Sequence, residues 1–175
     1  MTDESVDAYL DVLRAAGWRV ELTRGGGGTT LNESFTLRHP RIPDGYRKFL
    51  DRVKSCANED ETVWFLCGDD YNETSEFAWA WNEMEKISLD GAEGSPEKTA
   101  KVIEFWNRHL PFIYSVGADY AFLAFRTTGE PFGSVVDGYD IGLTEVTDVA
   151  RSFEEFMASH SAAVRGETNE LQDYV

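Results

Sequence analysis

LPFIYSVGADYAFLAF, residues 110–125, holds two apolar runs on either side of a short turn. The first run covers residues 112–115, the second covers residues 120–125, and Gly117 lies in the turn between them. Two apolar runs joined by so short a connection predict a pair of neighbouring antiparallel strands. A third short strand is expected at residues 133–136, after a turn at Thr128-Gly129. The sequence therefore predicts an antiparallel sheet.

Helical and strand patterns surround this hairpin. After His160 the composition turns polar, so we expect residues 161–175 to form a loose tail. The remainder is expected to be one α+β domain over residues 1–160, with a mostly antiparallel or mixed sheet flanked by helices. Helices are expected at residues 6–16, 43–53, 96–106 and 149–157, the last capped by Asp148. Further strands are expected at residues 18–22 and 62–67, and residues 77–81 fit either a strand or a helix continuing through Met84.

Four stretches carry a family likeness by their order and spacing. Residues 42–50 place a proline before an aromatic residue and a Phe-Leu pair, and residues 110–120 form a glycine-containing turn that ends in Asp119 before an apolar strand. Residues 133–136 supply the following strand, and residues 152–157 supply the closing helix. Together these stretches resemble the SUKH superfamily, the Smi/Knr-like group. The resemblance implies a single α+β domain whose bacterial members are similar to immunity proteins that bind and neutralise toxin domains, often nucleases, and whose fungal members regulate through protein contacts.

Charge is unevenly distributed along the chain. The 175 residues carry a formal net charge of −16, and residues 58–97 hold twelve acidic side chains against one basic side chain, Lys86. This balance disfavours direct binding to nucleic acid or to an anionic membrane, because phosphate contacts need Lys and Arg. No apolar run approaches the ~20 residues that cross a bilayer. Two cysteines, Cys56 and Cys67, are too few for a disulfide framework, so a cytoplasmic protein is expected.

Patterns that carry catalysis or bind cofactors are incomplete. His39, His109 and His160 lie too far apart for a short-spaced metal motif. Ser115 lacks the Gly-x-Ser-x-Gly turn of a hydrolase, and we expect nearby His109 to end a helix as an imidazolium and Asp119 to shape the turn. The glycine run at residues 25–28 is not followed by the lysine of a phosphate-binding loop, so a flexible hairpin tip is expected. We therefore expect no enzyme activity, no cofactor and no metal.

The acidic segment supplies the candidate partner-binding residues. Its dense carboxylate run fits a solvated loop, a surface that binds a basic protein, or a carboxylate-based metal or hydrolytic site. Neighbouring aromatic residues, among them Phe77, fit either the core or an interface anchor. The leading hypothesis is an immunity protein that binds a basic toxin enzyme stoichiometrically; a regulatory or scaffold module that binds host proteins is the alternative, and a carboxylate enzyme the third. The candidate residues are Glu59, Asp60, Glu61, Asp69, Asp70, Glu73, Glu76, Trp79 and Trp81.

Overall fold

The computed structural model describes residues 2–24, 28–75, 79–117, 120–139 and 145–175. Within these ranges, seven strands form one sheet in sequence order, and every neighbouring pair is antiparallel. The expected α+β domain with an antiparallel sheet is confirmed. The strands are β1 (Arg19–Leu22), β2 (Val53–Ala57), β3 (Val63–Phe65), β4 (His109–Ser115), β5 (Ala121–Arg126), β6 (Val135–Tyr139) and β7 (Thr147–Ala150).

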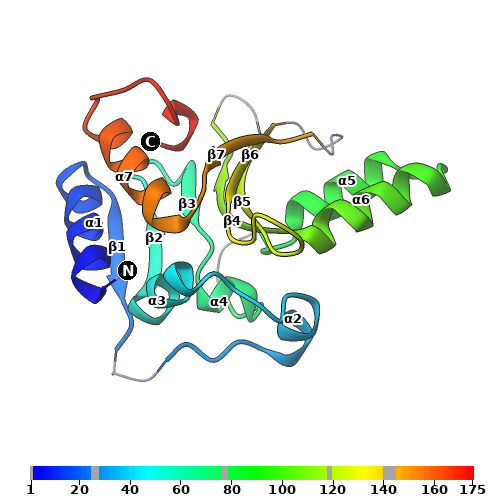
Figure 1. Cartoon of the computed structure of the whole chain (residues 1–175), viewed down its shortest axis with the longest axis horizontal. Helices are drawn as coiled ribbons and strands as arrows, with labels where there is room; N and C mark the ends of the chain where they lie inside the picture. Colours follow the sequence, from blue (N-terminus) through cyan, green and yellow to red (C-terminus); the bar gives the residue numbers. More distant parts are fainter. Residues whose placement is uncertain (1, 25–27, 76–78, 118–119, 140–144) are drawn as a thin grey trace.

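Helices gather in two groups around the sheet. Figure 1 shows α5 and α6 side by side, extending away from β4 and β5, while α1 and α7 lie together at the other end, beside β1 and β2. The short helices α2 and α4 lie at the lower edge of that view. The helices are α1 (Asp3–Ala15), α2 (Glu33–Arg38), α3 (Asp44–Arg52), α4 (Gly68–Tyr71), α5 (Glu83–Gly91), α6 (Pro96–Arg108), α7 (Phe153–Val164) and the 3-10 helix η1 (Gln172–Tyr174).

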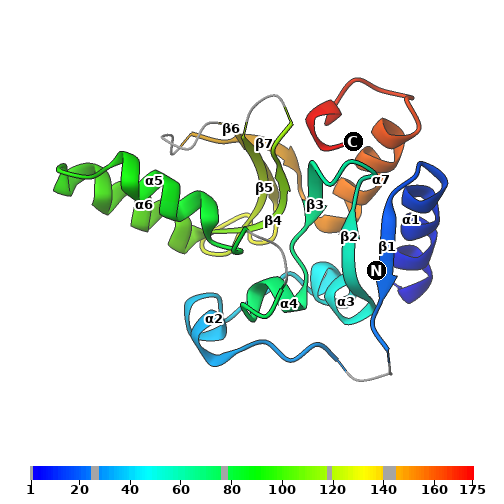
Figure 2. The same ribbon diagram turned by 180° about the vertical axis from the view of Figure 1, so that it is seen from behind.

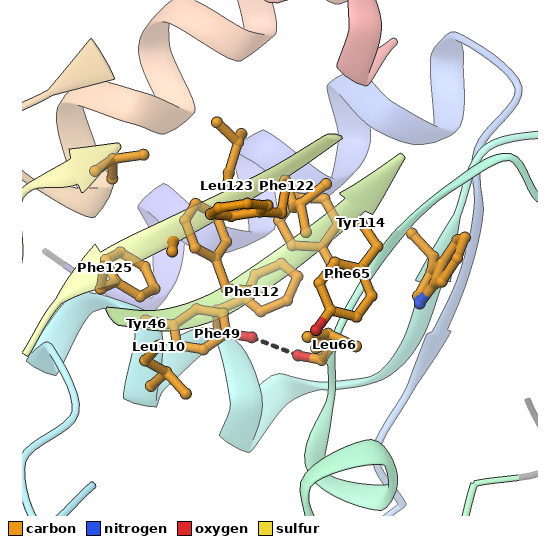
Figure 3. Packing of buried hydrophobic residues seen from close by; sticks show 14 of the residues in the cluster. Tyr46, Phe49, Phe65, Leu66, Leu110, Phe112, Tyr114, Phe122, Leu123 and Phe125 are labelled. Carbon is orange, nitrogen blue, oxygen red and sulfur yellow. Dashed lines mark hydrogen bonds between the residues drawn. The ribbon is translucent and has the colours of Figure 1, made fainter. Parts of the chain in front are cut away.

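The two strands of the hairpin at residues 110–125 are buried on both faces. On one face, the Phe112 ring stacks on Phe125 with ring centroids 4.2 Å apart, and Tyr46 of α3 packs against both (Figure 3). The Tyr46 hydroxyl donates to the Leu66 carbonyl. On the other face, Phe122 packs against Trp106 of α6 at 4.9 Å. Helices therefore cover both sides of β4 and β5, which accounts for sequence runs that are apolar without alternation.

Glycine is required at one position of β6. Gly138 lies opposite Phe122 across the β5–β6 ladder. A Cβ atom at Gly138 would lie 2.2 Å from Phe122 Cζ, well inside van der Waals contact. The absent side chain therefore leaves room for the Phe122 ring on the face that α6 covers.

Several expected boundaries were wrong. The helix expected at residues 43–53 ends at Arg52, and Val53 is already the first residue of β2. Asp148 does not cap the last helix: it lies in β7, and Ser152 caps α7 by accepting from Glu155 N. Trp79 and Trp81 lie outside every strand and helix, whereas Phe77 and the glycines at 25–27 are outside the described residues.

The C-terminal segment is packed where a loose tail was expected. Tyr174 is fully buried, and its hydroxyl donates to Asp137 of β6. Its carbonyl lies 2.6 Å from His160 Nε2, which must donate because a carbonyl can only accept. His160 Nδ1 then accepts from the Tyr9 hydroxyl at 2.6 Å. These bonds join α1, α7, β6 and the last turn of the chain.

A half-buried ion pair ties α2 to the α5–α6 pair. Arg38 makes a bidentate contact with Glu85 of α5, at 2.6 and 2.8 Å, and its Nε donates to Asn107 of α6 at 2.9 Å. The Glu85 side chain is only 10% exposed. A carboxylate this buried depends on the guanidinium for its charge compensation.

We expect Arg38→Ala to lower the free energy of unfolding by about 3 kcal/mol, because it leaves the buried Glu85 carboxylate unpaired. The double variant Arg38→Met/Glu85→Leu removes both charges, and we expect it to recover to within about 1 kcal/mol of wild type. Urea unfolding at pH 7 measures both. Equal losses in the single and double variants would contradict a charge-pairing role.

Candidate partner-binding site

A hollow of about 480 Å³ opens where β1 and β2 meet α4. In the β1–β2 ladder, Glu21 pairs with Ser55, on the face opposite the buried Cys56. Figure 2 shows this part of the sheet from the side opposite α3 and α7. The lining residues are Glu21, Lys54, Ser55, Glu61, Phe65, Asp69, Asp70, Thr74 and Ser75. The hollow therefore gathers four carboxyl groups from three separate segments.

Local structure fixes two of these segments. In the β2–β3 turn, Asn58 Oδ1 accepts from the backbone N–H groups of Thr62 and Val63, at 2.9 and 3.0 Å, and this holds Glu61 in place. The α4 segment packs closely against the chain at Thr29: a Cβ atom at Gly68 would lie 2.5 Å from Thr29 Cγ2. Both segments are thus anchored next to the carboxyl groups that they present.

The carboxyl groups of the hollow differ in their pairing. Lys54 Nζ lies 3.2 Å from Glu21 Oε1, and Arg19 lies 2.8 Å from Glu61 Oε1. Both pairs are about half exposed and therefore weak. Across the described parts of the chain, none of the ion pairs involves Asp69 or Asp70. The uncompensated negative charge therefore lies on the α4 side of the hollow.

Asp70 is not the surface residue that the sequence suggested. It is 5% exposed, and its Oδ2 accepts from Cys67 N at 2.7 Å at the start of α4. Burial raises the pKa of the Asp70 carboxyl, and the Cys67 N–H donor opposes that rise. Asp70 therefore lies at the base of the hollow, whereas Asp69 is exposed at its rim.

The other acidic candidates surround this hollow unevenly. Glu59 and Asp60 are exposed on the β2–β3 turn next to Glu61, and Glu73 is exposed just after α4. Glu76 lies outside the described residues. Sequence reasoning missed Glu21, because only the pairing of β1 with β2 places it beside the acidic segment.

The two candidate tryptophans have different surroundings. Trp81 is 7% exposed and packs against Phe35 and Tyr71, so it is a core residue and not an interface anchor. Trp79 is half-buried and its ring lies 5.2 Å from that of Tyr120, which is 45% exposed. Of the five rings named here, only those of Trp79 and Tyr120 are partly exposed.

None of the three histidines is fully exposed. Burial lowers the pKa of His39, His109 and His160 to about 4, so all three are neutral at pH 7. His109 is the C-cap of α6 and the first residue of β4, so it ends the helix as expected, but it is neutral and not the expected imidazolium. Its Nδ1 donates to the Phe105 carbonyl at 2.9 Å. Asp119 lies outside the described residues. In the described parts of the chain, no three His, Cys, Asp or Glu side chains are placed to hold a metal ion.

We expect the free energy of unfolding to fall as pH drops from about 6.5 towards 4. In that window the unfolded chain protonates its histidines and the folded protein does not, which costs at most about 1.4 kcal/mol per pH unit for each histidine. The raised pKa values of Asp70 and Asp137 oppose part of this loss. His39→Leu should flatten the slope by about a third, and at pH 7 it removes a buried ring whose two nitrogens lack hydrogen bonds. Urea midpoints at pH 7, 6 and 5 test this; identical slopes would contradict it.

Glu61 has a left-handed backbone, with φ of 56°. Such a conformation costs a side-chain-bearing residue about 1 kcal/mol, and glycine adopts it freely. We therefore expect Glu61→Gly to raise the free energy of unfolding by about 1 kcal/mol, even though it removes a carboxyl group from the hollow. The control is Glu59→Gly. Glu59 is not among the positive-φ residues of the described chain, so this variant should have a lower free energy of unfolding than wild type. Thermal unfolding compares the two, and a shift of the same sign in both would contradict the assignment of strain.

Comparison with known proteins gives the family. No helix in the described parts of the chain has the length and apolar character of a membrane span. A comparison with curated proteins finds no match. The model of the SMI1 / KNR4 family (SUKH-1), which is not a known enzyme family, matches residues 39–159. This match contains α3, the central strands and the start of α7, and the chain belongs to the SMI1 / KNR4 family (SUKH-1).

Proposed function

We propose that this protein is an immunity-type binding protein that neutralises a toxin enzyme by stoichiometric contact through the acidic surface around β1, β2 and α4. One observation carries the proposal: Glu21, Glu61 and Asp69 line one hollow although they come from separate segments. Exposed Glu59 and Asp60 on the adjacent turn extend the negative surface. SUKH domains are an immunity-protein type, which supports a protein as the ligand.

Electrostatics favours a basic partner. A surface of one charge sign raises the rate of encounter with a surface of opposite sign, and the net charge of −16 adds to this attraction over a longer range. A nuclease presents such a surface, because its cleft must bind phosphates. An acidic protein seated on that cleft would exclude the nucleic acid without any chemistry of its own.

We expect reversal of charge on this surface to abolish capture of the partner. The test bait is Glu61→Lys/Asp69→Lys, and the matched control is Glu93→Lys/Glu104→Lys, which makes the same charge change near the α5–α6 pair. Glu61 has an ion-pair partner in Arg19, and Glu104 has one in Arg108, so each double variant breaks one ion pair. Wild type and control should retain one basic protein from lysate of the source organism, and the test bait should retain none. Equal retention by both variants would place the binding surface elsewhere.

The captured protein is then expressed in a host cell with and without this chain. An immunity protein restores growth when the two are expressed in equal amounts, and the test bait does not. If the captured protein is harmless to the host, the acidic protein used as bait is a regulatory or scaffold module and not an immunity protein.

We expect the affinity for the basic partner to fall about tenfold or more between about 50 and about 500 mM NaCl, because salt screens exposed charges. Most of this loss should come from slower association, and surface plasmon resonance measures the association and dissociation rates separately. The Glu93→Lys/Glu104→Lys control variant should keep the salt dependence of wild type. An affinity independent of salt would contradict electrostatic recognition.

A further inference from the structure

We propose that a second surface of this protein binds an extended segment of a protein partner through an aspartate or glutamate side chain, which Arg41 receives. The surface is a groove of about 580 Å³ lined by residues 40–45, 132–133 and 151–154, called here the Arg41 groove. These residues lead into α3, belong to the turn between β5 and β6, and lead into α7. None of them lines the acidic hollow, so the inference does not depend on the proposed function.

Apolar side chains form much of the wall of this groove. Ile42 and Phe132 are half-buried, and Pro43 is buried. The Gly133 N–H donates to the Arg126 carbonyl at 2.8 Å, which fixes the turn that carries Phe132. A Cβ atom at Gly133 would lie only 3.4 Å from Pro43 Cγ, so the turn packs directly against the start of α3. The groove therefore has a fixed apolar wall that can take an apolar side chain of a ligand.

Arg41 is a cation held in position without an ion pair. Its guanidinium carbon lies 3.9 Å from the centroid of the Phe132 ring, and the residue is exposed. In the parts of the chain that the structure describes, none of the ion pairs involves Arg41. A guanidinium can stack on an aromatic face and still donate from its edge to a carboxylate. Phe132 thus orders Arg41 while the N–H donors stay open to a ligand.

The missing ion pair stands out in so acidic a chain. Acidic side chains outnumber basic ones by 32 to 16, and most basic side chains of the described chain form an ion pair. Arg151, which also lines the groove, lies 3.1 Å from Glu155, and Arg47 of α3 lies 3.4 Å from Asp51. Arg41 is left without such a partner, so its charge is complementary to an anion that a ligand brings.

The two acidic residues of the groove are compensated locally. Asp44 lies in the first turn of α3, and Glu154 lies in the first turn of α7. The positive end of each helix stabilises a carboxylate at such a position. Arg41 is therefore the charge of the groove that still lacks a partner.

A carboxylate fits this position better than a phosphate. The fork of a guanidinium matches a carboxylate in a bidentate contact. A phosphate would bring up to about two negative charges beside Asp44 and Glu154, on a protein whose net charge is −16. A single carboxylate adds the least repulsion, and the apolar wall takes the side chain next to it. The ligand is therefore an extended segment with an aspartate or glutamate beside an apolar residue.

A phage-displayed library of random peptides is selected against wild type and, in parallel, against Arg41→Met, whose side chain still covers the Phe132 ring. We expect wild type to enrich peptides with an acidic residue beside an apolar one, and Arg41→Met to lose them. The most enriched peptide is then made with blocked termini, and fluorescence anisotropy at about 150 mM NaCl measures its affinity. Replacing its acidic residue by the corresponding amide should weaken binding about tenfold or more, because a charge-assisted contact is lost.

The same peptide is titrated into three variants. Arg41→Met should weaken its binding about tenfold or more. The matched control Lys98→Met removes an exposed cation outside the groove that also has no ion pair within the described chain, and it should weaken binding less than about twofold. Glu61→Lys/Asp69→Lys changes the acidic hollow and should not weaken binding, which separates the two surfaces.

Equal losses in Arg41→Met and Lys98→Met, or an amide peptide that binds as tightly as the acidic one, would overturn the Arg41 groove. A selection in which wild type enriches no acidic peptide, or the same peptides as Arg41→Met, would do so too. If Arg41→Met lowers the urea midpoint strongly, Arg41→Lys replaces it. Lysine keeps the charge without the planar fork, so binding should fall at least about threefold, and an unchanged affinity would be equally contrary. Loss of the peptide in Glu61→Lys/Asp69→Lys would place its site in the acidic hollow instead.

Discussion

Burial of β4 and β5 on both faces constrains every other element. Antiparallel sheets commonly leave one face to water, but here Phe112 and Phe125 pack under α3 and α7 while Phe122 packs under α6. A sheet buried in this way needs two separate helical layers. The α5–α6 pair forms the second layer and is joined to the rest through the half-buried contact of Arg38 with Glu85.

The same constraint leaves room for the site. The second helical layer covers the sheet over its central strands, while Arg19 and Glu21 of β1 remain exposed at the sheet edge (Figure 2). There the turn after β2 and the short helix α4 supply carboxyl groups. Topology thus places the first part of the acidic segment, from Glu61 to Asp70, next to β1 and β2.

Much of the fold was predictable because its signals are local. The apolar runs at 112–115 and 120–125, the proline at the start of the 43–53 helix and the Ser95-Pro96 start of α6 each report a nearby interaction. Predictions failed where the deciding contact is distant in sequence. Tyr174 is fixed by Asp137 and His160, and nothing in the polar composition of 161–175 indicates those bonds.

The candidate site was likewise predictable only in part. Sequence composition located the acidic segment, but spacing could not separate exposed Asp69 from buried Asp70, because one residue of helix turns the side chain from the rim to the base. Local rules are also broken here: Glu61 and Glu73 have positive φ, and Asp70 Oδ1 is buried without a donor. Folding alone would favour glycine or asparagine at the first two positions and a satisfied side chain at the third. Leu171 is the third positive-φ residue other than glycine in the described chain, so two of the three carry exposed carboxyl groups of the acidic surface. Binding of a basic partner would account for acidic side chains kept at these two positions, since the partner would supply the opposite charge.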